Sequence, residues 1–306
     1  MASGLSLYYF RELVVLTLID QKGNLIFCYV FQGRSHAYFS PFHLFTFSVF
    51  LTSPAQASDT VRLTTGHWPP YFDESADDNG LLAELITQAY ATQGLKTEFT
   101  FYPWSWALML AKAGQFDGTA AWSCVEQRAH NFLYSAGVLP YQYVFYHRHT
   151  LQFDWASVED LEGMSVGATQ DYSYNEKLAN LMGRGTVSVD VTTSDEANFR
   201  KLLAGRIDLF PMDPLVGMAM IDQWMTPEEA KELTFAPKPF KSSYYHVLFG
   251  HKNPRSKTLR YRLNEGLRAL WASGEFQEIV EKWLATEVPS DNTLDLKLFR
   301  PRFDEC

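Results

Sequence analysis

Two side chains of opposite charge stand where this sequence could hold a small charged molecule. Arg128 ends a polar turn that follows an apolar stretch, residues 118–122. The end of a buried strand is where open α/β sheets place ligands, and a guanidinium offers a rigid fork of donors that suits a carboxylate. Asp213 follows a second apolar stretch, residues 207–212, and its carboxylate could accept a cation. The chemistry indicated is recognition of a guest that carries both charges.

The two charges follow two copies of one local pattern. Residues 112–117 read KAGQFD and residues 203–208 read LAGRID, so each copy places a glycine three residues before an aspartate. Such a glycine is typical of a helix that ends in a left-handed residue, and the aspartate then enters an apolar strand. Two similarly built halves that present opposite charges predict a cleft between them.

Apolar periodicity predicts the elements that position these groups. In the first half we expect strand 61–65, helix 80–93, strand 99–101, helix 106–113 and strand 118–122. In the second half we expect strand 165–168, helix 174–182, strand 186–191, helix 195–204, strand 207–212 and helix 214–224. This order favours an α/β fold with a mainly parallel sheet.

Further elements lie between and after the two halves. An aromatic run at 141–147 predicts a strand that separates them. A strand at 244–250 and two helices, 257–273 and 275–284, follow the second half. We expect residues 287–306 to form a loosely held polar tail.

Size, charge and composition restrict the class of protein. A chain of 306 residues is too long for most single cores and predicts two lobes or domains. The net charge of −9 argues against binding a nucleic acid, and the eight histidines have no metal-ligand spacing, so we predict neither a metal nor another cofactor. Three cysteines cannot form a disulfide framework. A pairing between Cys124 and Cys306 stays open, but we favour two free thiols because a chain terminus rarely holds disulfide geometry.

An export signal is predicted near the N-terminus. Residues 42–51 form an apolar run of signal-peptide length, Arg34 precedes it, and residues 54–57 (PAQA) provide an A-x-A cleavage pattern. Cleavage near Ala57 would release a soluble mature chain into the periplasm, without a stretch long enough to span a membrane. Residues 1–57 are therefore predicted to be a signal peptide preceded by an over-extended N-terminus.

An ordered set of short motifs resembles the extracytoplasmic solute-binding proteins, family 3, of amino-acid ABC importers. The motifs are GHWPPY (66–71), GLL (80–82), PW (103–104), AGQFD (113–117), VEQR (125–128), VGAT (166–169), AGRID (204–208), LNEGL (263–267), GEFQEI (274–279) and KW (282–283). Each motif is weak alone, but the set spans residues 61–284. The resemblance implies the type II periplasmic-binding fold, with two crossover strands as a hinge. The first lobe would comprise 58–146 and 246–306, and the second 147–245.

The resemblance also implies roles for individual residues. Arg128 would hold the α-carboxylate of an amino acid and Asp213 its α-ammonium group. The remaining ligand-binding positions would be Ser123 beside the arginine turn, Tyr172 and Ser173 at the start of a second-lobe helix, and the pocket walls Trp68, Tyr71, Trp104 and Trp122. Small hydroxyl residues are common just before the arginine turn in the family, but this chain has Ala120, Ala121 and Trp122 there. A different small amine or an aromatic ligand therefore remains open.

Other interpretations compete with these assignments. Arg128 could cap a surface turn, and Asp213 could be the N-cap of the helix that begins at Pro214. The implied function is a monomeric binding protein that delivers its ligand to the membrane permease of an ABC importer. The alternatives are a dehydratase-like enzyme on the same scaffold and a ligand-sensing module that acts through a separate receptor. An enzyme would need an acid or base in the cleft, for which His67, Glu126 and Asp171 are the candidates.

Overall fold

The computed structural model describes residues 7–10, 13–19, 25–31, 60–170, 172–174, 176–287, 299–304 and 306. The chain divides into two compact units, Met1–Gln56 and Ala57–Cys306. In the first unit, three strands form an antiparallel sheet in chain order: β1 (Leu7–Phe10), β2 (Leu13–Ile19) and β3 (Leu25–Phe31). The predicted export signal lies outside the described residues.

The second unit is built on a mixed sheet in the order β11-β8-β13-β6-β4-β5. Its strands, with β7 and β12 attached to its sides, are β4 (Thr60–Thr65), β5 (Lys96–Phe101), β6 (Gly118–Ser123), β7 (Phe132–Tyr134), β8 (Leu139–Arg148), β11 (Phe210–Met212), β12 (Leu233–Phe235) and β13 (Lys241–Gly250). Strand β4 is parallel to β5 and β6, whereas β8 and β13 pair antiparallel with their neighbours. A separate parallel pair comprises β9 (Ser165–Thr169) and β10 (Ser188–Thr192).

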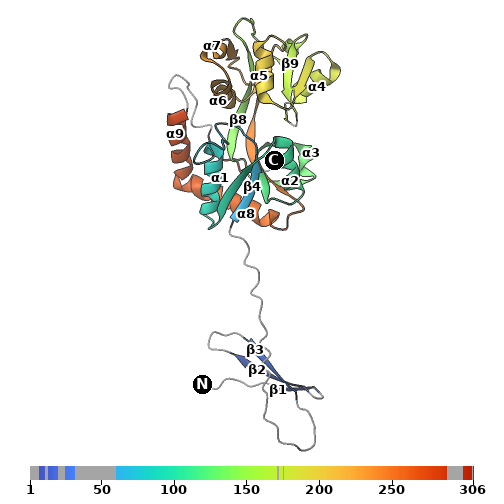
Figure 1. The fold of residues 1–306 in the computed structure, drawn as a ribbon, viewed down its shortest axis with the longest axis vertical. Coiled ribbons are helices and arrows are strands. Elements are labelled where there is room, and N and C mark those ends of the chain that lie inside the picture. Colours follow the sequence, from blue (N-terminus) through green and yellow to red (C-terminus); the bar gives the residue numbers. More distant parts are fainter. Residues whose placement is uncertain are drawn as a thin grey trace, which may run out of the picture. The chain divides into compact units, whose positions relative to one another are not determined.

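The helices of the second unit gather in two groups (Figure 1). We call the first lobe the group around β4–β7: α1 (Leu81–Ala91), α2 (Trp104–Lys112), α3 (Glu126–Ala129), α8 (Ser256–Ser273) and α9 (Glu275–Glu287). We call the second lobe the group around β9–β12: the 3-10 helix η1 (Val158–Leu161), α4 (Glu176–Arg184), α5 (Asp195–Leu203), α6 (Pro214–Trp224) and α7 (Pro227–Ala230). None of the helices in the described part of the chain combines the length and apolarity that a bilayer span requires.

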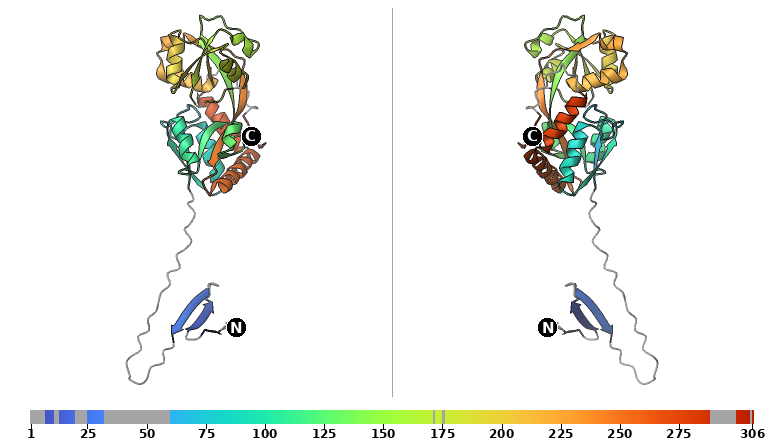
Figure 2. Two further views of the ribbon diagram at one scale, coloured as in Figure 1. Left: turned by 90° about the vertical axis from the view of Figure 1, so that its right-hand side faces the viewer. Right: turned by 90° about the vertical axis from the view of Figure 1, so that its left-hand side faces the viewer.

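Two long strands connect the lobes. Lys241 pairs with Tyr143 and Tyr245 with Leu139, which holds β13 antiparallel to β8. The far half of β8 pairs with β11 and β12 in the second lobe, while the far half of β13 pairs with β6 and β7 in the first. Figure 2 shows β13, in orange, running from one lobe to the other. The predicted lobe boundaries at 146 and 245 fall inside these two strands.

The first lobe packs α1 closely against α8. The face of α1 that carries Leu85 and Ala89 is fully buried, as is Leu263 of α8. A Cβ atom on Gly266 would lie 2.0 Å from the backbone oxygen of Ala89, so only glycine allows this approach. The predicted amphipathic helices at 80–93 and 257–273 are confirmed with shifts of one or two residues at their ends.

The first copy of the repeated pattern has the expected backbone. Gly114 follows α2 with a φ of 79°, so the helix ends in a left-handed residue. Asp117 then enters the sheet: its Oδ2 accepts a hydrogen bond of 2.9 Å from the backbone N–H of Arg62, and its own N–H donates to the Arg62 carbonyl. Arg255 completes the arrangement with an ion pair of 3.1 Å to Asp117, which is 2% exposed.

The second copy repeats this arrangement in the other lobe. Gly205 has a φ of 70°, and Oδ2 of Asp208 accepts a hydrogen bond of 2.9 Å from the backbone N–H of Ser165. The Asp208 N–H donates to the Ser165 carbonyl at 2.8 Å, and Arg148 supplies the ion pair at 3.6 Å. The predicted likeness of the two halves therefore extends to the hydrogen bonds that join each aspartate to a neighbouring strand.

The C-terminal segment corrects two expectations. Cys124 and Cys306 form a disulfide with their Cα atoms 5.6 Å apart, so the prediction of free thiols was wrong. The segment is also not loose where it is described, because Arg302 and Gly137 exchange backbone hydrogen bonds of 2.7 and 2.8 Å and Phe299 is 7% exposed. These long-range backbone bonds bring the last residue to the turn that follows β6, which the local sequence does not reveal.

Removal of this disulfide is expected to destabilise the second unit. The cross-link joins residues 182 positions apart, and such a link stabilises mainly by restricting the unfolded chain. Replacing both Cys124 and Cys306 by serine should lower the free energy of unfolding by about 2–4 kcal/mol. Denaturant melts with and without a reductant test this. The variant should be insensitive to the reductant, and identical non-reducing melts of variant and wild type would contradict the disulfide.

Candidate functional site

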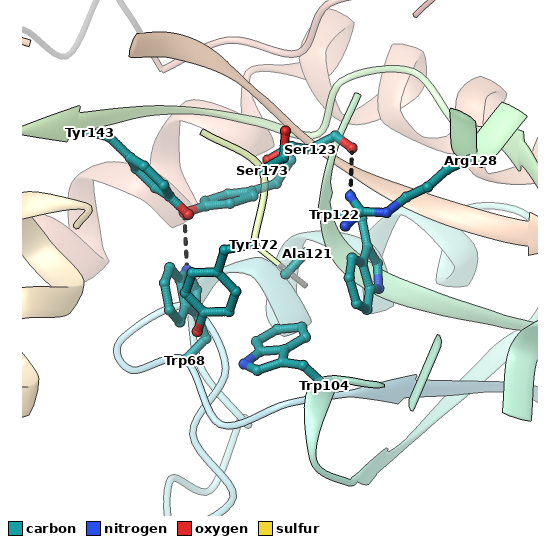
Figure 3. A pocket seen from close by; sticks show the side chains of 10 residues that line it. Trp68, Trp104, Ala121, Trp122, Ser123, Arg128, Tyr143, Tyr172 and Ser173 are labelled. Atoms are coloured by element: carbon teal, nitrogen blue, oxygen red, sulfur yellow. Dashed lines mark hydrogen bonds between the residues drawn. The ribbon is translucent and has the colours of Figure 1, made fainter. Parts of the chain in front are cut away.

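A cavity that is partly open to solvent lies against the strands that connect the two lobes (Figure 3). Its lining residues are Trp68, Trp104, Ala121, Trp122, Ser123, Arg128, Tyr143, Tyr172, Ser173 and Tyr245. Seven of the nine predicted ligand-binding residues are among them. The other two, Tyr71 and Asp213, do not line this cavity.

An irregularity in β6 shapes the wall beside the arginine. Trp122 pairs with His246 and Thr119 with Leu248, so β6 gains one residue relative to β13. Ala121 has a φ of 65°, a left-handed conformation that costs a residue with a Cβ atom about 1–2 kcal/mol. A bulge of this kind changes the direction of the side chains that follow it. Ala121 and Trp122 line the cavity at this bulge, in a strand that is buried throughout.

Aromatic rings form most of the remaining wall. Trp68 contacts Trp104 edge-on at 5.9 Å between ring centroids and Tyr172 at 5.4 Å, while Trp104 contacts Trp122 at 5.3 Å. Gly66 is required for this packing, because a Cβ atom there would lie 2.4 Å from the Trp104 ring. Trp68 and Trp104 come from the first lobe and Tyr172 from the second, so the aromatic wall spans both lobes (Figure 3).

Arg128 lies in the last turn of α3 and faces the cavity (Figure 3). Its guanidinium carbon is 4.7 Å from the centroid of the Trp122 ring, within the range of a cation–π contact. One guanidinium nitrogen donates a long hydrogen bond of 3.4 Å to the Ser123 carbonyl. The tryptophan ring orients the planar group at the cavity wall, where its fork of donors can meet a carboxylate.

Asp213 is buried behind this wall, with 1% of its surface exposed. Its Oδ1 accepts hydrogen bonds from the backbone N–H groups of Leu215 and Val216 at 2.9 and 3.3 Å. Asp213 is therefore the N-cap of α6, as the alternative interpretation of this residue predicted, and Pro214 occupies the first helical position.

Two tyrosine hydroxyls contact the other carboxylate oxygen of Asp213. Tyr71 and Tyr245 donate to Oδ2 at 3.4 and 3.5 Å, and the indole N–H of Trp68 donates to the Tyr245 hydroxyl at 3.0 Å. Tyr245 lines the cavity, so one side chain links Asp213 to it. The predicted wall residue Tyr71 is 2% exposed and lies with Asp213 instead.

Burial raises the pKa of Asp213 from 3.8 to about 7. The hydrogen bonds from Val216, Leu215, Tyr71 and Tyr245 favour the ionised form and offset part of this rise. Near neutral pH the side chain is thus close to half protonated, and a cation brought near it would favour ionisation.

The second-lobe side of the cavity differs from the prediction in its secondary structure. Helix α4 begins at Glu176, so Ser173 lies in the loop three residues before it and not in its first turn. The Tyr172 hydroxyl donates to Oδ2 of the buried Asp195 at 2.6 Å, while Thr169 donates to Oδ1 at 2.7 Å. Asp195, at the start of α5, thereby fixes the orientation of a residue that lines the cavity.

Two tyrosines that line the cavity and a lysine beside it were missed by the sequence analysis. Tyr143 of β8 and Tyr245 of β13 line it, and Lys241 donates a hydrogen bond to the carbonyl oxygen of Ser173. The aromatic run at 141–147 contained a signal, because alternate residues of a strand share a face. No local pattern marks Lys241. Within the described ranges, no cluster of His, Cys, Asp and Glu could hold a metal ion.

These features together define a class of protein. Two α/β lobes connected by a pair of long strands, with an aromatic cavity and an arginine between them, form the architecture of the two-lobed periplasmic binding proteins. The chain belongs to the bacterial extracellular solute-binding proteins, family 3, whose profile matches residues 62–286. No curated protein sequence matched the chain.

Solved structures confirm the predicted fold. A histidine kinase sensor domain with similarity to periplasmic binding proteins is 24% identical, with a TM-score of 0.65 over 74% of this chain and 96% of that one. An ancestral arginine-binding protein bound to arginine is 21% identical, with a TM-score of 0.64 over 74% and 99%. A putative L-cystine ABC transporter from Listeria monocytogenes is 18% identical, with a TM-score of 0.60 over 74% and 96%.

Asp213 should make the stability of the ligand-free protein depend on pH. A carboxyl group whose pKa is higher in the folded state than the ordinary 3.8 binds more protons in that state, so stability falls as the pH rises from about 4 to about 7. The loss is at most about 4 kcal/mol. Asp213→Asn keeps an N-cap oxygen and removes the titration, so its stability relative to wild type should increase between pH 5 and pH 8.

Thermal melts of both proteins from pH 4 to pH 8 measure this difference. Asp195→Asn is the matched control, because burial raises the pKa of Asp195 only to about 6 and its effect should be complete at a lower pH. Parallel stability curves for wild type and Asp213→Asn would show that the carboxyl group is not protonated in this range.

Proposed function

We propose that this protein is the extracytoplasmic substrate-binding protein of an ABC importer and that it binds an amino acid or a similar small zwitterion between its lobes. One observation carries the proposal: the Arg128 guanidinium is stacked on Trp122 at the wall of a cavity to which both lobes contribute. Membership of solute-binding family 3 supports it independently. The partner would be a membrane permease that accepts the ligand.

Each end of a zwitterion has a candidate partner. The carboxylate would bind Arg128, because a buried carboxylate needs a charge-assisted hydrogen bond to offset lost hydration. The ammonium group would approach the hydroxyl of Tyr245, behind which Asp213 lies at 3.5 Å. The charge of Asp213 would then stabilise the ammonium group without exposure of the carboxylate. The aromatic wall would contact the rest of the ligand.

Lobe closure would accompany binding. The two lobes contact each other through Trp68 and Tyr172, and His67 lies 3.3 Å from Gln223 of α6. Strands β8 and β13 are the connections about which a hinge motion would occur. We expect the radius of gyration from small-angle scattering to decrease when a confirmed ligand is added.

A sensory role is the second candidate, because one similar structure is a histidine kinase sensor domain. The fold alone does not separate transport from sensing. A binding protein for transport should restore uptake of the radiolabelled ligand when it is supplied with its permease, whereas a sensory module should not.

Of the candidates for an enzymatic acid or base, His67 and Glu126 do not line the cavity, and Asp171 lies outside the described residues.

Arg128 provides the central test of the proposed binding site. A thermal-shift screen of amino acids, amines and small acids identifies ligands, because a molecule that binds only the folded state raises the melting temperature. For any ligand found, Arg128→Ala should weaken binding by about 3–5 kcal/mol in calorimetry, since the carboxylate loses its partner.

Arg62→Ala is the matched control for this substitution. Arg62 also lies over an aromatic ring, 5.4 Å from the centroid of Phe116, but it does not line the cavity. Its removal should change affinity by less than about twofold. Unchanged affinity in a folded Arg128→Ala variant would refute the assigned site, and a screen without any amino acid among the ligands would refute the proposed ligand class.

A further inference from the structure

A second cation lies beside the cavity. Lys241, the first residue of β13, is partly buried, and its ammonium group donates a hydrogen bond to the carbonyl oxygen of Ser173. The ammonium nitrogen is also 5.4 Å from the ring centroid of Tyr141 and 5.5 Å from that of Tyr143. Lys241 does not itself line the cavity, but it contacts two residues that do, Ser173 and Tyr143.

Lys241 and Arg128 influence each other electrostatically. Burial, together with the smaller effect of the positive charge of Arg128, lowers the pKa of Lys241 from 10.5 to about 8. The two cations come from different elements, β13 and α3: Arg128 lines the cavity, and Lys241 contacts two residues that line it, Ser173 and Tyr143. Lys241 remains mostly protonated at pH 7, so the cavity is flanked by two positive charges at neutral pH.

The partners of Lys241 do not neutralise its charge. None of the ion pairs found within the described ranges includes Lys241. A carbonyl oxygen and two ring faces stabilise an ammonium group, but an anion would do so more strongly in a partly desolvated place.

We propose that Lys241 binds a second anionic group of the ligand, so that the ligand is an acidic amino acid or a closely related compound with two acid groups. This inference rests on the proposed amino-acid-binding function and specifies the substrate class of the same site. Arg128 would hold one carboxylate and Lys241 the other, and each cation would be neutralised on lobe closure. A neutral amino acid would leave Lys241 without an anion when water is excluded.

Pairs of ligands that differ only in charge provide the test. We would measure the affinity of the full chain at pH 7 for L-glutamate against L-glutamine and for L-aspartate against L-asparagine, by calorimetry. The wild type should favour the acidic member of at least one pair by roughly tenfold or more. Lys241→Gln should reduce affinity for that acid by roughly tenfold to a hundredfold and change affinity for its amide by less than about threefold. Lys241→Arg should retain the preference.

Lys238 supplies a matched control. It also donates to a backbone carbonyl, that of Ala156, and lies 4.6 Å from the Trp155 ring centroid, but neither of these two residues lines the cavity. Lys238→Gln should leave the ratio of acid to amide affinity unchanged. If Lys241→Gln fails to fold, Lys241→Met takes its place, because it keeps the apolar stem and removes the positive charge: loss of the acid preference would support the role of Lys241, and an unchanged preference would overturn it.

Different binding results would overturn the role of Lys241 and the proposed binding function. Tight binding of a neutral amino acid that depends on Arg128, without a preference for the acidic members, would overturn the role of Lys241 and leave the binding function intact. An acid preference that persists unchanged in Lys241→Gln would also overturn it. Absence of binding to all four amino acids would overturn the acidic ligand class, and absence of binding to every amino acid would overturn the function as well.

Discussion

The antiparallel pairing of β8 with β13 is the constraint on which the rest of the second unit depends. Each strand is ten residues long, and beyond their shared pairs β8 continues into the second lobe and β13 into the first. The same ladder stacks Tyr141 on Tyr245 at 4.4 Å between centroids. Both the junction of the lobes and the wall of the cavity therefore depend on one register. A shift of one residue would turn these side chains to the opposite face.

The site contains two charged groups, Arg128 and Asp213, that lie in different environments. Arg128 stays at the cavity wall, where its guanidinium group lies over the Trp122 ring. Asp213 is removed from water, and the fold supplies two backbone N–H groups and two tyrosine hydroxyls in place of a cation. Because burial of a charge is costly, the carboxyl group responds by a higher pKa.

The elements of this fold could be predicted because their signals are local. Glycines at 114 and 205 end helices in the left-handed conformation, and the aspartates that follow join equivalent neighbouring strands in the two lobes. The alternation of strands and helices required only apolar periodicity. The ends of the elements were predicted less accurately than their existence: helix α4 begins two residues later than expected. That shift moved Ser173 from a helix terminus into a loop.

The sequence by itself determined the two-lobed α/β architecture and most of the residues around the cavity, because helix ends, strand periodicity and an ordered set of motifs are encoded in neighbouring residues. Only the tertiary structure decided which partners these residues meet. Lys241 is brought to Tyr143, which lines the cavity, by the register of β13 against β8, and Cys306 reaches Cys124 through backbone bonds between Arg302 and Gly137. The depth of Asp213 likewise follows from the packing of Tyr71 and Tyr245 around it. These contacts join segments far apart in the chain, so no local pattern could specify them.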